Sequence, residues 1–228
     1  MINKLIEYRI SKENKRQFKD NGWTLVDLKL SKEAINNSLK GLREMRKSSI
    51  QKDYKPRRIY YDHLISNNPS AIELPFNKEI CNENVRNLFR EARIGSLIRE
   101  LMSWDYPCCD LARLFCMSGF NYRGNWHRDY YGELEKIQYS SLKRDVVLVG
   151  LYLLPQKGFR LLKKEFEYKG KKTVIPNKNI DAAIRSFSFP LNPKKETYYE
   201  IEGKVGTALF FDPLLMHQGS SFSERLDF

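Results

Sequence analysis

The sequence predicts a mainly β fold with flanking helices, in which a helix-rich N-terminal part packs on a double-sheet jelly roll. Short β-type runs separated by Pro, Asn and Gly fill the second half of the chain, as in jelly-roll proteins. Apolar residues recur at helical spacing in the first half. A chain of 228 residues, 41% hydrophobic, can bury one core. We expect one domain over 1–228, with the helix-rich part at 1–105 and the jelly-roll core at 106–228.

The N-terminal part is expected to begin with a helix, a strand and a second helix. Ser11 is an N-cap residue and Gly22 can adopt the left-handed conformation of a C-cap. Residues 23–30 alternate between apolar and polar, which predicts a strand. Ser31 would cap the second helix. Its apolar stripe consists of Ile35, Leu39, Leu42 and Met45.

Residues 48–76 show no regular periodicity and contain several prolines and asparagines. Irregular stretches of this length in a compact domain are usually functional loops, so we expect a loop that forms a wall or lid of a site. Helical periodicity returns over 79–103, and Gly95 is expected to divide that segment into two helices.

The remaining segments are expected to supply the strands of the jelly roll. A strand over 109–116 and a turn over 121–124 lead into a strand that contains His127. An apolar strand over 146–154 ends at Pro155. The elements expected after it are an amphipathic strand at 159–165, a hairpin at 167–176, a short helix at 178–185 and strands at 187–191, 196–202 and 205–212.

Three residues form a candidate metal site. His127 and Asp129 are two positions apart, so on an extended strand they face the same side. His217 follows a β-type run and the Pro213 break, and a strand end in a barrel can direct its imidazole to the same cavity. Two histidines and a carboxylate bind one face of Fe(II) and leave positions for a cosubstrate and dioxygen. The alternatives are a zinc site with these ligands, and surface or turn positions for His127 and Asp129.

Arg225 lies eight residues beyond His217. A guanidinium suits the far carboxylate of a 2-oxo acid because its planar fork makes two charge-assisted hydrogen bonds. An isolated arginine near a strand is usually a solvated charge, but the position of Arg225 after His217 favours a role in binding this carboxylate. His63, the third histidine of the chain, is expected to be structural. The tyrosines expected near the site are Tyr130, Tyr131 and Tyr152.

The net charge of +12 and the pI near 9.5 favour anionic partners, which include nucleic acid and phosphorylated metabolites. The four cysteines form no C-x-x-C pair, so reduced thiols are expected. The apolar runs are too short to span a bilayer, and the N-terminus is charged too early for a signal peptide. We therefore expect a soluble, cytoplasmic protein. The sequence does not indicate an oligomeric state.

Several motifs occur in a fixed order along most of the chain. They are Phe18-x-x-x-Gly22-Trp23, Trp126-His127-x-Asp129, Gly206-Thr-x-x-x-Phe211-x-Pro213-x-x-x-His217 and Arg225. This order resembles the phytanoyl-CoA dioxygenase family. One departure is the segment 158–164, which reads Gly-Phe-Arg-Leu-Leu-Lys-Lys where the family often has Pro-Gly-Ser-His. The chain also stops three residues past Arg225, within an expected strand, which suggests a fragment or a trimmed form.

The resemblance implies a fold, a chemistry and a set of residue roles. Members of the family are Fe(II)- and 2-oxoglutarate-dependent oxygenases on a cupin-like double-stranded β-helix. By this resemblance His127, Asp129 and His217 are the catalytic iron ligands, and Arg225 holds the distal carboxylate of 2-oxoglutarate. The implied reaction consumes dioxygen, converts 2-oxoglutarate to succinate and hydroxylates a small or medium organic substrate. Asp129 favours hydroxylation because related halogenases lack this carboxylate.

Two other functions are compatible with the same pattern. One is an oxygenase that acts on nucleic acid or protein, which the basic charge would suit. The other is a jelly-roll binding protein without catalytic turnover. The three intact metal-ligand candidates argue against the second alternative.

Overall fold

The computed structural model describes residues 10–50, 58–62, 65–74, 82–105, 112–120, 126, 147–163, 165–168, 171–174, 195–213, 215–219 and 222–227. The helices are α1 (Lys12–Asn21), α2 (Lys32–Ile50), α3 (Glu83–Ala92), α4 (Ile94–Met102) and the 3-10 helix η3 (Lys195–Thr197). The strands are β1 (Trp23–Asp27), β2 (Arg58–Asp62), β3 (Ile65–Leu74), β4 (Ala112–Phe120), β5 (Leu148–Tyr152), β6 (Gln156–Leu162), β7 (Glu165–Tyr168), β8 (Lys171–Val174), β9 (Tyr198–Gly203), β10 (Thr207–Phe211), β11 (His217–Gln218) and β12 (Phe222–Asp227). None of the described helices is long and apolar enough to cross a membrane.

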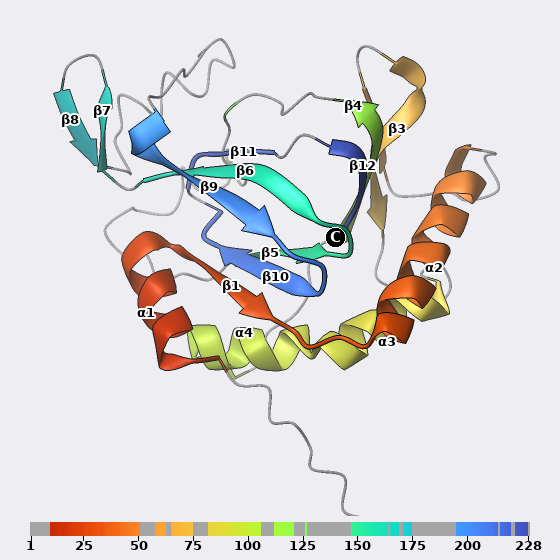
Figure 1. Ribbon diagram of the computed structural model, residues 1–228, viewed down its shortest axis with the longest axis horizontal. Helices are drawn as coiled ribbons and strands as arrows, with labels where there is room; N and C mark the ends of the chain where they lie inside the picture. Colours follow the sequence, from red (N-terminus) through yellow and green to blue (C-terminus); the bar gives the residue numbers. More distant parts are fainter. Residues whose placement is uncertain are drawn as a thin grey trace, which may run out of the picture.

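The described strands form two sheets and a separate hairpin. The large sheet has seven strands in the order β1-β10-β5-β12-β4-β3-β2, and the small sheet has three in the order β11-β6-β9. β7 and β8 pair with each other, and all the described pairings are antiparallel. Helices α1, α3 and α4 lie on one side of the β1-β10-β5 part of the large sheet, and the small sheet lies on the other side (Figure 1). The described part of the chain is therefore a mixed fold of helices and antiparallel sheets.

Strand β10 shows how one alternating run serves two hydrophobic clusters. Ala208 and Phe210 belong to the cluster under the helices, whereas Leu209 and Phe211 belong to the cluster between the two sheets. All four side chains are buried. Because successive side chains of a strand point to opposite faces, the large sheet is covered on both faces here. The inter-sheet cluster is the one that surrounds the candidate site.

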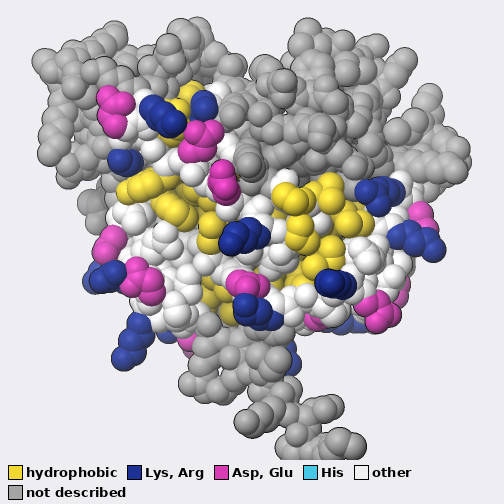
Figure 2. Space-filling view, viewed as in Figure 1, with side chains coloured by type: hydrophobic (Ala, Val, Ile, Leu, Met, Phe, Trp, Pro, Cys, Tyr) yellow, Lys and Arg dark blue, Asp and Glu magenta, His cyan; other side chains and the backbone are white. Residues whose placement is uncertain are grey.

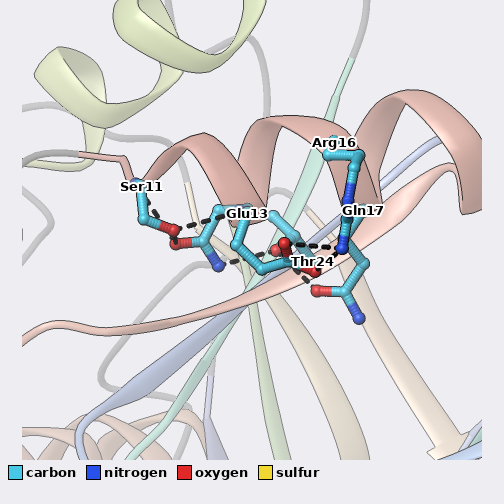
Figure 3. Close-up of polar contacts among 6 residues, drawn as sticks. Ser11, Glu13, Arg16, Gln17 and Thr24 are labelled. Atoms are coloured by element: carbon cyan, nitrogen blue, oxygen red, sulfur yellow. Dashed lines mark hydrogen bonds and ion pairs between the residues drawn. The ribbon is translucent and has the colours of Figure 1, made fainter.

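A polar network fastens α1 to β1 (Figure 3). Ser11 and Asn14 form a capping box, in which each side chain accepts a hydrogen bond from the backbone N–H of the other residue. The Nδ2 of Asn14 donates to Thr24 Oγ1 at 2.9 Å and to the Leu25 carbonyl at 2.8 Å. Thr24, which is fully buried, donates in turn to Gln17 Oε1 at 2.9 Å. The network satisfies polar groups that burial would otherwise penalise.

The capping signals predicted at the N-terminus are confirmed. Gly22 ends α1 with φ +79°, and its N–H donates to the Phe18 carbonyl at 2.8 Å. Ser31 Oγ accepts from the N–H of Ala34 at 3.1 Å at the start of α2. The stripe residues Leu39, Leu42 and Met45 are buried.

The strand predicted over 23–30 is too long, since β1 ends at Asp27. The Asp27 carboxylate accepts a hydrogen bond from the N–H of Lys29 at 3.0 Å, and Lys29 has φ +51°. Such a local side-chain to backbone bond turns the chain out of the extended conformation.

The prediction of an irregular stretch over 48–76 is wrong for the described residues within it. α2 continues to Ile50, and β2 and β3 form an antiparallel pair that joins the large sheet through β4. Pro69 lies opposite Tyr61, between two shifts of the β2–β3 register. Proline lacks an N–H to donate to a ladder, so it is tolerated at such an irregularity.

The break predicted at Gly95 is displaced. The helices separate at Arg93, which has φ +50°, and Gly95 lies inside α4. The hairpin expected over 167–176 is confirmed by β7 and β8, and the strand expected over 205–212 by β10. The strand expected over 196–202 starts later, because η3 occupies its first residues. The elements expected at 121–124, 178–185 and 187–191 lie outside the described residues.

Candidate metal centre

His217 lies in β11, a two-residue strand at the edge of the small sheet. It pairs antiparallel with Leu161 of β6. The N–H of Leu162 also donates to the Met216 carbonyl at 2.8 Å, which extends the contact by one residue. Directly opposed residues share a sheet face, and Leu161 is fully buried in the inter-sheet cluster. The pairing therefore fixes the direction of the His217 side chain toward the large sheet.

Two phenylalanines from different sheets contact the imidazole of His217. The ring of Phe159 in β6 is stacked at a centroid distance of 5.7 Å and an angle of 24°. The ring of Phe211 in β10 meets it edge-on at 5.1 Å and 69°. His217 is only 4% exposed. It is thus a polar side chain held between the sheets by apolar neighbours, where the hydrogen bonds of its ring determine its chemistry.

One of those hydrogen bonds fixes the tautomer of His217. Its Nδ1 lies 3.0 Å from the Leu215 carbonyl oxygen. A carbonyl oxygen only accepts, so Nδ1 carries the proton and the lone pair of the neutral ring is on Nε2. Histidines that bind metals characteristically donate their other ring N–H to a carbonyl or carboxylate in this way. His217 therefore has the local geometry of a metal ligand that coordinates through Nε2.

Trp126, the residue before His127, is buried and packs on the other face of the small sheet. Its ring lies 5.7 Å from the ring of Tyr198 in β9, at an angle of 58°. Tyr198 pairs with Leu162 of β6, one position beyond the inward-facing Leu161. Alternation therefore places Tyr198, and with it Trp126, on the face turned away from the large sheet.

The backbone of Arg225 lies in β12, opposite Met117 of β4. The prediction that Arg225 belongs to a strand is confirmed. On its other side β12 pairs with β5, where Asp227 is opposite Tyr152. Tyr152 is 2% exposed and belongs to the inter-sheet cluster. The structure thus brings the strand that bears Arg225 beside a strand that lines the space between the sheets.

The other predicted site residues, which are His127, Asp129, Tyr130 and Tyr131, lie outside the described residues, and so does His63. Within the part of the chain that the structure describes, no group of three or more His, Cys, Asp or Glu could hold a metal ion. The set of two histidines and a carboxylate therefore stays a prediction.

Sequence reasoning missed the groups that surround His217. Phe159 and the Leu215 carbonyl carry no motif. The apolar alternation of β6 could have indicated that Phe159 faces the core, but the identity of the facing strand required the fold.

Tyr199 is the titratable neighbour of this cluster. Its hydroxyl donates to Asn21 Oδ1 at 3.0 Å, and its ring contacts Trp23 at 5.4 Å. Burial raises the pKa of the Tyr199 phenol. The side chain therefore remains a neutral hydrogen-bond donor at neutral pH.

Comparison with known proteins identifies the fold. No protein-family model matches the chain, and no curated protein matches it in sequence. Solved structures match over nearly all of it. EctD from S. alaskensis with 2-oxoglutarate and 5-hydroxyectoine is 17% identical with a TM-score of 0.65, covering 96% of this chain and 73% of EctD. AviO1 from Streptomyces viridochromogenes Tue57 is 13% identical with a TM-score of 0.60, covering 94% and 91%.

A third match is the epimerase SnoN in complex with Fe3+, alpha ketoglutarate and nogalamycin RO. It is 9% identical with a TM-score of 0.61, covering 94% of this chain and 80% of SnoN. EctD has also been solved with bound Fe. At these identities the likeness shows a shared fold. The chain thus shares a fold with EctD and SnoN, which have been solved with iron and with 2-oxoglutarate. The resemblance to the phytanoyl-CoA dioxygenase family rests on the sequence motifs.

Proposed function

We propose that the protein is an Fe(II)- and 2-oxoglutarate-dependent oxygenase that hydroxylates a small or medium organic molecule. His127, Asp129 and His217 would hold the iron, and Arg225 would hold the distal carboxylate of 2-oxoglutarate. The observation that carries the proposal is the state of His217. Its imidazole is buried between the sheets, and its Nδ1 proton is committed to the Leu215 carbonyl, so Nε2 is the atom that would face a metal.

The position of Trp126 supports the assignment of the other two ligands. Trp126 packs on the outer face of the small sheet. If the chain from Trp126 to Asp129 is extended, as the sequence predicts, alternation directs His127 to the opposite face, on which His217 lies. Asp129 would share that face because it is two residues further on. The set would then match the two histidines and one carboxylate that suit Fe(II).

The register of β12 supports the role of Arg225. Asp227 is opposite Tyr152, whose side chain belongs to the inter-sheet cluster. Strand alternation predicts that position 225, two residues earlier, lies on the same sheet face. A guanidinium there would bind a carboxylate through two parallel hydrogen bonds.

The chain's own residues would provide position and an environment with little water. The iron, once bound with 2-oxoglutarate and dioxygen, supplies the oxidising chemistry that couples decarboxylation to hydroxylation. Phe159 stacks on the His217 ring and Phe211 meets it edge-on, and these contacts limit its rotation. The Leu215 carbonyl holds the proton on Nδ1. Together these contacts prepare the imidazole before a metal binds, which reduces the ordering that binding requires.

A small-molecule substrate is favoured over nucleic acid. On the face shown in Figure 2 the Lys and Arg side chains of the described residues are interspersed with Asp and Glu, and apolar side chains lie between them. A binding surface for nucleic acid usually concentrates its basic residues. The matched structures of EctD and SnoN contain the small molecules 5-hydroxyectoine and nogalamycin RO, which supports the same substrate class for this chain.

The proposal is tested by an anaerobic titration of the apoprotein with Fe(II) and then with 2-oxoglutarate. We expect a visible metal-to-ligand charge-transfer band. His217→Ala and His127→Ala should abolish the band, and Arg225→Ala should raise the 2-oxoglutarate concentration needed to produce it. His63→Ala is the matched control, since it removes the third histidine of the chain and should leave the band unchanged.

Two outcomes would reject the proposal. A folded wild-type protein that produces no band has no oxygenase site of this kind. If that protein instead binds Zn(II) tightly and loses it in the His217→Ala variant, the site is a zinc centre. Loss of the band in His63→Ala would show that the ligand set has been assigned wrongly.

A further inference from the structure

The outer face of the small sheet carries a cluster that connects three strands and Trp126. Its centre is Arg160 of β6. The guanidinium carbon lies 4.9 Å from the centroid of the Tyr198 ring in β9. One terminal nitrogen of Arg160 donates to Gln218 Oε1 of β11 at 3.4 Å, and the other to Glu200 Oε1 of β9 at 3.4 Å. The ring of Trp126 packs against the same Tyr198 ring in a tilted arrangement. We call Trp126, Tyr198, Arg160 and Gln218 the outer-face clamp.

Arg160 forms an ion pair with Glu200 at 3.4 Å, but one of its donors has no partner in the described part of the chain. Its side chain is 25% exposed, and its Nε is buried with no hydrogen-bond partner among the described residues. A buried donor without an acceptor costs free energy, and the hydrogen bonds of Arg160 to Gln218 and Glu200 are both long, at 3.4 Å. The cation–π contact with Tyr198 and the ion pair with Glu200 compensate in part. An arginine with a buried donor that has no hydrogen-bond partner needs an explanation other than folding stability.

The explanation we offer is that two residues of the outer-face clamp are adjacent in the sequence to the candidate histidines. Gln218 directly follows His217, and Trp126 directly precedes His127. The contacts run from Trp126 to Tyr198, from Tyr198 to Arg160 and from Arg160 to Gln218. One continuous set of contacts therefore joins the two chain segments that carry the candidate histidines, from the face opposite to the His217 imidazole.

We infer that Tyr198 and Arg160 are positioning residues for the metal centre. By fixing Trp126 and Gln218 they fix the spacing between the segments that bear His127 and His217. The inference rests on the proposed function. Outer contacts of this kind that orient metal ligands typically change metal affinity by about 10- to 100-fold when they are removed. The aromatic ring of Tyr198 is the essential part because it contacts both Trp126 and Arg160.

The test is the Fe(II) dissociation constant, measured anaerobically at saturating 2-oxoglutarate from the charge-transfer band. Tyr198→Leu removes the ring and should weaken Fe(II) binding by about 10-fold or more. Tyr198→Phe keeps the ring and should bind Fe(II) within about twofold of wild type, because both contacts are made by the ring. Arg160→Met leaves the Trp126–Tyr198 ring contact in place. It provides a milder variant if Tyr198→Leu folds poorly, and it should weaken Fe(II) binding severalfold.

The control for general loss of stability is Asn14→Ala, which breaks the network between α1 and β1, since the partners of its side chain, Thr24 and Leu25, are not residues of the outer-face clamp. It should lower the melting temperature and leave the Fe(II) dissociation constant unchanged. The visible spectrum of the Co(II)-substituted proteins provides a second readout. Its d–d bands should change in Tyr198→Leu, because the ligand geometry changes, and stay constant in Asn14→Ala.

The outcomes distinguish a failure of the clamp inference from a failure of the proposed function. A wild-type protein that does not bind Fe(II) overturns the proposed function, and the clamp inference with it. A wild-type protein that binds Fe(II), with Tyr198→Leu and Arg160→Met binding equally well, overturns the clamp inference alone. Equal weakening of Fe(II) binding in Asn14→Ala and Tyr198→Leu would also overturn the clamp inference, since the lower Fe(II) affinity would then follow from a loss of stability.

Discussion

Replacement of Gly203 by alanine tests the contact between the two sheets. Gly203 ends β9 of the small sheet, and its Cα faces the ring of Tyr152 in β5 of the large sheet. A Cβ at position 203 would lie 2.0 Å from Tyr152 Cδ2 and 2.3 Å from Cε2. Tyr152 is 2% exposed, so its ring cannot move into solvent. An alanine therefore requires the ring or the sheets to shift.

The size of the effect follows from two opposing contributions. Overpacking of a buried side chain typically costs about 1–3 kcal/mol. Gly203 is not among the glycines with positive φ, so alanine also gains about 0.4–1 kcal/mol by restricting the unfolded chain. A Cβ placed 2.0 Å from a buried ring puts the first contribution at about 2–3 kcal/mol, so the expected net loss is about 1–2.6 kcal/mol. For a chain of this length each kcal/mol lowers the melting temperature by about 2–4 °C.

A double-mutant cycle in urea isolates the contact. Gly203→Ala, Tyr152→Ala and the double variant are unfolded and followed by circular dichroism. In the Tyr152→Ala background the ring is absent, so Gly203→Ala should be neutral or stabilising. Gly95→Ala is the control, since nothing lies within 4 Å of a Cβ at that helical position, and it should stabilise by roughly 0.5–1 kcal/mol. A wild-type midpoint for Gly203→Ala, or the same loss in both backgrounds, would refute the contact between the sheets.

Three further predictions concern the N-terminal unit. Asn14→Ala removes the two hydrogen bonds that Nδ2 donates, one of them to the buried Thr24, and the capping-box bond that Oδ1 accepts from the Ser11 N–H. It should cost about 1–3 kcal/mol; an unchanged urea midpoint would contradict the network. Gly22→Ala places a Cβ at φ +79° and should lower the free energy of unfolding by about 1–2 kcal/mol, whereas an unchanged thermal midpoint would exclude the left-handed cap. The pKa of Asp27 is lowered by hydrogen bonds from the side chain and the backbone N–H of Lys29. Since the folded pKa lies below the unfolded one, its contribution is present above the unfolded value of about 3.9 and is lost as the pH falls through the folded value. The stability difference between wild type and Asp27→Asn should therefore shrink on acidification, and a constant difference would refute the assignment.

Features that depend on a few neighbouring residues could be predicted from the sequence. Ser11 and Ser31 marked the starts of α1 and α2, and Gly22 marked the end of α1, because caps satisfy backbone groups within one turn. The alternation in β10 indicated a strand with two buried faces. The single domain stays a prediction. The assignment of His127 and Asp129 as metal ligands and of Arg225 as the residue that binds 2-oxoglutarate also stays a prediction.

Features that depend on distant partners became visible only in the folded chain. Residues of β2 and β3 give no periodic signal, yet they are extended because β4 supplies the pairing strand; local propensity is weak against such pairing. Nor could the sequence show that Phe159 and Phe211 enclose His217, since the two rings come from different sheets. A strand pattern gives the face of each side chain but not the strand that covers it. The motif therefore suggested the chemistry of His217. The fold showed that its ring is buried between the two sheets, and that a hydrogen bond from Nδ1 to the Leu215 carbonyl puts the lone pair of the neutral ring on Nε2.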